Sequence, residues 1–196
     1  VMTYDNAGRL YAKVLPEKYR DGAKLSDMSR IVFVYDKMDR ILLEQDIYYD
    51  EKEKAFQTIT SKANQYDKNG NVIKTLDALG YESGTGTTIG EKISSGYGTI
   101  NTYNDANLLL TTLSAESKDK GIAYDVKNTY DAAGRKIAEI NANNIERKYS
   151  YDNAGRVTDT TVVDSKETLI QHNTYDRMGN VLTQMDGNGN TATFTY

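Results

Sequence analysis

One short phrase recurs along the chain and limits its possible folds more than any other feature. A tyrosine and an Asp or Asn are followed by two variable residues and then by Gly, Asn or Asp. Arg comes next in four copies, and the residue after that is apolar in six. The spacing between copies is about 21 residues late in the chain and longer before that, so the unit is short and carries insertions in the first half. The copies begin at Tyr4, Tyr35, Tyr66, Tyr103, Tyr130, Tyr151 and Tyr175, and Tyr196 would open another.

The second and fourth positions of the repeat predict a tight turn. Asp or Asn at the second position accepts hydrogen bonds from backbone N–H groups just ahead, and the fourth position always holds a residue type that tolerates positive φ. This pattern is typical of a β-hairpin loop closed by a bulge. The turn-opening residues are Asp5, Asp36, Asp67, Asn104, Asp131, Asp152 and Asp176, and the positive-φ candidates are Gly8, Asp39, Gly70, Asn107, Gly134, Gly155 and Gly179.

The bulge also predicts the register of each hairpin. Tyr4 would lie across from Leu10, and six of the seven residues at Leu10 and its equivalents are apolar, with Lys136 as the exception. We expect the tyrosines and these apolar residues on one sheet face. The repeat arginines would then point to the opposite face with the turn aspartates; they are Arg9, Arg40, Arg135 and Arg156.

A second kind of turn follows the first at a fixed distance. The segments Asp77–Gly80, Asn141–Asn144 and Asp186–Gly189 end in residues of the same types. Only six or seven residues separate successive turns, which suits a short strand and is too short for an average helix. The sequence therefore predicts an all-β fold, an antiparallel meander of hairpin repeats forming a curved sheet.

Two stretches interrupt the repeats, and we expect both to be insertions or long loops. Residues 15–30 contain the only proline and are either a loop or a short helix starting after Pro16. Residues 82–98 are rich in Gly, Ser and Thr, which indicates a long hairpin loop or a flexible excursion. No linker divides the chain, so residues 1–196 are interpreted as one repeat segment cut from a larger repeat protein.

Composition narrows the function classes. Hydrophobic residues make up 38%, below the roughly 45–50% of an average globular protein, and 16 are tyrosines, so we expect a thin, tyrosine-rich core. The net charge of −4 argues against a nucleic-acid surface. The absence of cysteine excludes disulfides and thiolate ligands, and no apolar run approaches the ~18 residues of a membrane span.

These residues resemble the YD repeat, also called the Rhs repeat, of very large secreted or surface bacterial proteins. The resemblance covers essentially the whole chain through its seven copies. It implies a section of a spiral β-shell, as in bacterial polymorphic toxins and insecticidal toxin complexes, where the shell encloses a C-terminal toxic domain, or as in the similar barrel of animal teneurins. The Asp-Pro motif where such shells cleave themselves is missing, since Leu15 precedes Pro16, so no self-cleavage is assigned.

Candidate sites for chemistry are each better explained in other ways. His172 is interpreted as a surface residue without a partner set, and turn capping accounts for the repeat aspartates. The loops at Asp67 and Asp186 resemble calcium loops but lack Gly at the sixth and Glu at the twelfth position. Residues 84–92, GTGTTIGEK, do not match a phosphate loop. We therefore predict no catalytic residue, metal or cofactor.

The predicted function is structural. The segment would build the wall of a shell that encloses and helps deliver a C-terminal toxin or effector, with neighbouring repeats as its partners, in a secreted or cell-surface protein. It would neither bind nucleic acid nor insert into a membrane. The alternative is a cell-surface adhesin module that binds glycans or proteins through exposed tyrosines and the loop at residues 82–98.

Overall fold

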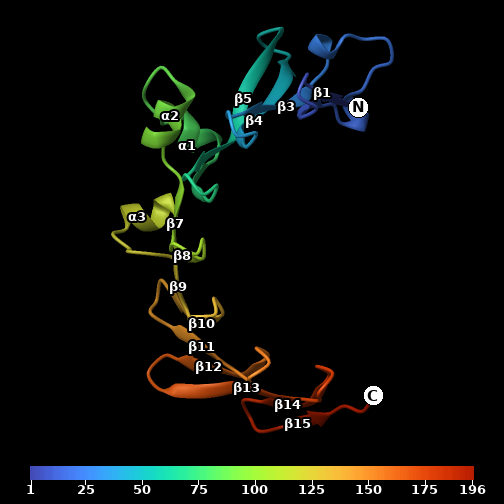
Figure 1. The fold of residues 1–196 in the computed structure, drawn as a ribbon. Coiled ribbons are helices and arrows are strands. Elements are labelled where there is room, and N and C mark those ends of the chain that lie inside the picture. Colours follow the sequence, from blue (N-terminus) through green and yellow to red (C-terminus); the bar gives the residue numbers. More distant parts are fainter. The chain divides into compact units, whose positions relative to one another are not determined.

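The structure, a computed structural model, describes the backbone of residues 1–196 and all side chains except those of Glu17 and Glu167. Backbone contacts divide the chain into two compact units, Val1–Ile100 and Asn101–Tyr196 (Figure 1, blue to green and yellow to red). No break in the sequence marks this division, which falls inside a strand.

The predicted all-β meander is confirmed. Strands pair with their chain neighbours in order from first to last, and the pairs are antiparallel. The strands of the described chain are β1 (Met2–Tyr4), β2 (Leu10–Lys13), β3 (Arg30–Tyr35), β4 (Ile41–Asp50), β5 (Ala55–Tyr66), β6 (Val72–Leu76), β7 (Thr99–Tyr103), β8 (Leu109–Leu113), β9 (Val126–Tyr130), β10 (Lys136–Asn141), β11 (Glu146–Tyr151), β12 (Val157–Val163), β13 (Glu167–Tyr175), β14 (Val181–Asp186) and β15 (Thr191–Thr193).

The hairpins have the expected register. Tyr4 pairs with Leu10, and the register shifts by one residue just before that pair, as the bulge requires. Lys136 occupies the same place opposite Tyr130, where its ammonium binds the Glu139 carboxylate at 2.8 Å. The other pairs of this kind are Tyr35 with Ile41, Tyr66 with Val72, Tyr151 with Val157 and Tyr175 with Val181.

Both irregular stretches contain short helical segments, which the sequence pattern allowed for residues 15–30 but not for residues 82–98. Residues 15–30 hold two 3-10 turns, η1 (Pro16–Lys18) and η2 (Leu25–Asp27), the first starting at the proline. Residues 82–98 carry the helix α2 (Ile89–Ser95) instead of an unstructured loop. A capping box explains it, because Thr88 accepts from the Glu91 N–H while the Glu91 carboxylate accepts from the Thr88 N–H.

One predicted turn is wrong. The segment Asp77–Gly80 begins the helix α1 (Ala78–Glu82), whereas the turns at Asn141–Asn144 and Asp186–Gly189 form as expected, with Asn144 and Gly189 at positive φ. Asp77 caps α1 by accepting from the Gly80 N–H at 2.8 Å. The same side chain can open a turn or a helix, and the residues after it decide which. A third short helix is α3 (Ala115–Asp119).

The first unit has a small hydrophobic core. Helices α1 and α2 pack on β5 and β6 and cover its central cluster, formed by Leu43, Ala63, Leu76, Tyr81 and Ile93 (Figure 1). Leu76, the last residue of β6, is fully buried, so the C-terminal end of this strand lies under the helices. The core therefore exists where an insertion supplies a second layer.

The second unit has almost no such core. Ala138 is its only buried apolar residue among the side chains described there, and Asn128 and Asn173 are buried as well. Most of its strand residues are half-buried. The expectation of a thin core thus holds most clearly here. No helix in the described part of the chain is long and apolar enough to cross a membrane.

Candidate functional site

The repeat turn is built by its aspartate. At Asp5, one carboxylate oxygen accepts from the N–H groups of Ala7 at 2.9 Å and Arg9 at 3.0 Å, while the Gly8 N–H donates to the Asp5 carbonyl at 3.0 Å. The Asp5 N–H closes the loop by donating to the Arg9 carbonyl. Every backbone donor that faces into the loop is satisfied, which is why a short polar side chain is needed at this position.

The same set of bonds recurs in the other copies. The fourth position has positive φ each time, at 59° in Asp39, 61° in Asn107 and between 79° and 94° in the glycines. Asn104 replaces the carboxylate with an amide oxygen and still accepts both N–H bonds. The turns open at Asp5, Asp36, Asp67, Asn104, Asp131, Asp152 and Asp176, and their fourth residues are Gly8, Asp39, Gly70, Asn107, Gly134, Gly155 and Gly179.

The residue after the fourth position also binds the side chain of the turn aspartate. In four copies an arginine guanidinium donates from Nε to the second oxygen of the turn aspartate at 2.7 Å. Asn71 and Asn180 make the equivalent bond through their amides at 2.8 and 2.9 Å. The arginines are Arg9, Arg40, Arg135 and Arg156.

Each of these arginines also reaches the next repeat. Its guanidinium lies over the ring of the following repeat tyrosine, 4.8 Å from the Tyr35 centroid for Arg9 and 4.7 Å from the Tyr175 centroid for Arg156. Arg40 over Tyr66 and Arg135 over Tyr151 do the same, at 4.5 and 4.7 Å. Such cation–π contacts contribute about 0.5–1 kcal/mol at exposed sites.

The prediction that the arginines face away from the tyrosines is therefore wrong. The bulge interrupts the alternation of the strand, so residues on either side of it cannot be assigned to faces by counting. The bond from Nε to the turn aspartate then folds the side chain along the turn and over the neighbouring ring. Charge and aromatic surface share one face as stacked layers.

The tyrosine hydroxyl completes the link. Tyr175 donates to the Val157 carbonyl at 2.7 Å, and Val157 is the residue that follows Arg156 in the preceding turn. The same bond joins Tyr35 to Leu10, Tyr66 to Ile41, Tyr130 to Leu109 and Tyr151 to Lys136, at 2.6 to 2.8 Å. We call this series of arginine and tyrosine contacts between successive turns the turn ladder.

Sequence reasoning missed a further member of the ladder. An asparagine two residues before the tyrosine is buried at Asn64, Asn128 and Asn173, and its amide donates to the same carbonyl that the tyrosine uses, at 3.2, 3.0 and 3.5 Å. The signal was available, because Asn-x-Tyr also stands at Asn101–Tyr103. A buried amide needs such partners.

The electrostatics of the turns favour ionised aspartates. The pKa of Asp152 lies below its ordinary value, first because the Arg156 N–H donates to it and then because the guanidinium does. For Asp176, where an asparagine replaces arginine, the side-chain amide of Asn180 is the main cause of the lowered pKa. Burial raises the pKa of Tyr66, which keeps its hydroxyl a donor.

The histidine has a partner that the sequence did not reveal. His172 Nδ1 lies 2.7 Å from a carboxylate oxygen of Asp159, directly across the β12–β13 pair. Cross-strand neighbours depend on the register of the strands, so the sequence separation of thirteen residues between His172 and Asp159 did not indicate that they are partners. In the part of the chain that the structure describes, no group of three or more metal-ligating side chains forms.

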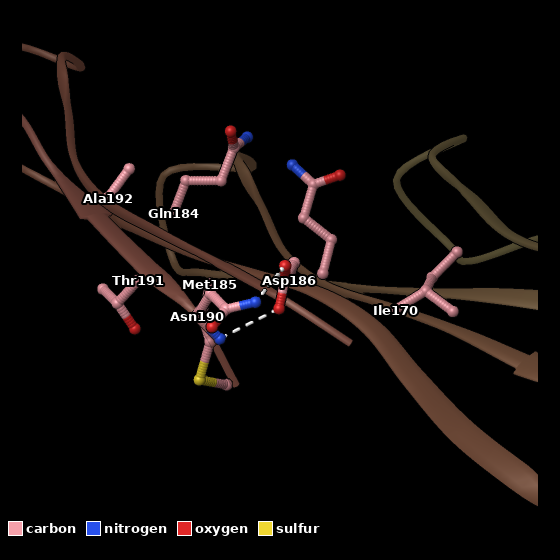
Figure 2. Close-up of a pocket in the computed structure, with 8 residues that line it drawn as sticks. Ile170, Gln184, Met185, Asp186, Asn190, Thr191 and Ala192 are labelled. Atoms are coloured by element: carbon pink, nitrogen blue, oxygen red, sulfur yellow. Dashed lines mark hydrogen bonds between the residues drawn. The ribbon is translucent and has the colours of Figure 1, made fainter. Parts of the chain in front are cut away.

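A pocket of about 450 Å³ lies away from the repeat turns, at the last three strands. Figure 2 shows its walls, with Gln184 and Ala192 on one side of the ribbon and Met185 on the other. A second, mainly apolar hollow of about 170 Å³ in the first unit is bordered by Leu15, Ile31 and Ile47. Neither hollow contains a set of groups for acid–base or nucleophilic catalysis among the described side chains.

Comparison with known proteins agrees with the repeat geometry. The family model described as RHS Repeat matches residues 130–167, which confirms the resemblance there. No curated protein matches the chain.

Solved structures share the fold. One described as TcdB2-TccC3 without hypervariable C-terminal region has a TM-score of 0.62 and 17% identity over the entire chain. Another, TcdB2-TccC3-Cdc42, has a TM-score of 0.50 and 18% identity, again over the entire chain. The chain spans 9% and 10% of these two proteins, so it corresponds to a small part of each.

Proposed function

We propose that the chain is a section of the wall of a β-shell that encloses a C-terminal toxin or effector within a secreted or cell-surface bacterial protein. The turn ladder is the observation that carries this proposal. Within each unit it joins successive hairpins through side chains, in addition to the backbone pairing of the strands. A wall needs this kind of contact, because the same contact can form between one repeat and the next along the sheet.

The wall role needs no catalytic group, and most of the repeat residues take part in holding the sheet. The aspartates accept from their own turns, and the arginines and tyrosines bind the adjoining repeat. The partners of this surface are therefore further repeats of the same kind. The bulges at the turns add twist to each hairpin, which supplies the curvature that closure around cargo requires.

The family resemblance supports an enclosed cargo. The toxin-complex shells that the repeat resembles surround a C-terminal toxic domain, and this chain shares its fold with part of the TcdB2-TccC3 structure. The adhesin alternative would use the repeat tyrosines as flat platforms for sugars. Four of those rings are covered by guanidinium groups, which weakens this alternative.

Protease protection tests the proposal in the longer polypeptide that it requires, with the cargo domain in place. We expect the cargo to resist a protease that digests the same domain when it is expressed alone. Replacing two ladder arginines, Arg135→Ala with Arg156→Ala, should make the cargo accessible. The matched control is Arg177→Ala, because Arg177 is an exposed turn residue outside the ladder.

Equal digestion of cargo inside and outside the wild-type polypeptide would contradict enclosure. Protection that survives the double substitution, with the sheet shown by spectroscopy to be loosened, would separate enclosure from the ladder and remove the ladder as its cause.

A further inference from the structure

The pocket at β13, β14 and β15 is lined by side chains that the turn ladder does not use. Its polar walls come from Gln171, Gln184, Asp186 and Asn190, and Figure 2 shows the bonds between the last two. Its volume of about 450 Å³ lies within the range of small-ligand pockets.

The two glutamines that line this pocket have their side-chain amides held by Asn173. The amide nitrogens of Gln171 and Gln184 both donate to the side-chain oxygen of Asn173, at 3.1 and 3.4 Å. Asn173 is buried and fixed in the repeat, so it orients both amides. With its nitrogen directed to Asn173, each glutamine turns its carbonyl oxygen away from that residue and leaves it available as an acceptor.

Asp186 adds a negative charge. Its carboxylate accepts from the N–H groups of Asn188 and Asn190 and from the Asn190 amide, all at 2.9 Å. The Asn190 side chain is the main reason that the pKa of Asp186 lies below its ordinary value. The described lining holds no Lys, Arg or His, so the pocket is rich in acceptors and carries a net negative charge.

We propose that this pocket binds the guanidinium group of an arginine side chain from another polypeptide segment. A planar guanidinium offers five donors in a fixed fork and can bond a carboxylate and amide oxygens together, whereas an ammonium is a compact point charge. Ala192, which lies on the same side of the ribbon as Gln184 in Figure 2, provides apolar surface for the methylene stem. This inference does not depend on the shell proposal.

The chain already makes this type of contact. Arg156 sits between the Asp152 carboxylate, at 2.6 Å, and the Asp176 backbone carbonyl, at 2.6 Å. A carboxylate and a neutral carbonyl oxygen thus suffice to hold a guanidinium in this sheet. A sugar is a weaker fit, because the described lining contains no aromatic ring on which it could stack.

The test is a titration of the isotope-labelled 196-residue chain, observed through the side-chain amide signals of Gln171 and Gln184. The probe is acetyl-Gly-Arg-Gly-amide, and the control peptide carries citrulline, which has the same shape without the charge. We expect saturable shifts with the arginine peptide, binding at least about tenfold weaker with citrulline, and weakening with added salt. Free arginine amide should bind similarly if the side chain alone is recognised.

Asp186→Asn provides the matched variant. Asn141 opens a turn of the same kind and accepts the equivalent N–H bonds, so asparagine at 186 keeps the turn and removes the charge. We expect a loss of at least about fivefold in affinity for the arginine peptide. Asp176→Asn changes a repeat turn outside the pocket and should leave affinity unaltered.

Three results would overturn the proposal. These are equal binding of the arginine and citrulline peptides, unchanged affinity in Asp186→Asn with the Gly189 amide signal retained, and shifts with methyl glucoside but none with the arginine peptide.

Discussion

Residues 1–100 and residues 101–196 contain the same repeat turn but differ in what lies behind it. Among the described side chains, the first unit buries nine apolar ones, five of them in the cluster that α1 and α2 form with the strands, whereas the second unit buries only Ala138. The nine are Ala12, Val14, Met28, Val32, Leu43, Ala63, Leu76, Tyr81 and Ile93.

This difference shows what the repeat does without a core. In the second unit the buried side chains with partners across the sheet are polar, at Asn128 and Asn173, and both bond to carbonyls of the preceding hairpin. Strand pairing and the turn ladder therefore hold this unit. In the first unit the same contacts are supplemented by a second layer.

The largest expected effect comes from the core of the first unit. Leu76→Ala should lower the free energy of unfolding of residues 1–100 by about 3 kcal/mol, because a fully buried leucine is lost and a cavity remains. Hydrogen exchange that resolves the two units would show faster opening in the first one.

The control for this substitution is Leu79→Ala. Leu79 is 83% exposed on α1, so its loss should change stability by no more than about 0.5 kcal/mol. If both variants destabilised the first unit equally, the helices would not be covering a core.

A smaller effect is expected from the turn ladder, and it should differ between the units. Arg156→Ala removes the bonds to Asp152 and the Asp176 carbonyl together with the contact to Tyr175. About 1.5 kcal/mol should be lost, since the side chain is partly exposed and its ion pair is screened. In the second unit this loss should speed exchange across β11 to β14.

Arg40→Ala is the matching change in the first unit. Arg40 makes the same three contacts, to Asp36, the Asp67 carbonyl and Tyr66. We expect faster exchange only near its turn, because the core keeps the rest of the unit closed. A spread of exchange through the whole first unit would mean that the core does not supplement the ladder.

Much of this architecture could be predicted because turn chemistry is local. The positive φ at Asp39 and Asn107 follows from residue type alone, and the bulge then fixes the pairing of Tyr35 with Ile41. Local signals fail where two outcomes start the same way. Asp77 begins a helix, although Asp186 begins a turn with a similar sequence.

The contacts between repeats could not be derived from the repeat itself. The position of Arg135 over Tyr151 depends on which hairpins become neighbours and on how the bulge redirects the side chain. The pairing of His172 with Asp159 likewise depends on the register of β12 and β13. The Asn-x-Tyr pattern was visible as repetition, but its reason, a shared carbonyl acceptor, requires the structure.

The next effect concerns the backbone of one turn. Gly155 has a φ of +81°, so Gly155→Ala should cost about 1 kcal/mol through strain in the left-handed region, although an added Cβ would meet only the Arg135 side chain, at an ordinary contact distance of 3.8 Å. Gly155→Asn should cost less, because Asn107 holds the same position at a φ of 61°. Denaturant unfolding monitored in the second unit would rank them, and Gly90→Ala, in open space on α2, is the control. Equal costs for the two substitutions would show that residue type at this position does not matter.

The smallest expected effect of any single residue is the loss of stability in acid, to which many aspartates contribute. Aspartates with lowered pKa stabilise the fold fully above their unfolded value of about 3.9 and lose that contribution as the pH falls through the lower folded values. The second unit has six such aspartates, at Asp125, Asp131, Asp152, Asp159, Asp176 and Asp186, and the first has three, at Asp5, Asp36 and Asp67.

Backbone amide spectra recorded from pH 6 to pH 3 should therefore lose signals of residues 101–196 first. Asp152→Asn should reduce this difference without opening the turn, because Asn104 accepts the same N–H bonds in a natural copy. Simultaneous loss of both units would mean that core burial, and not the ionised turns, sets their acid stability.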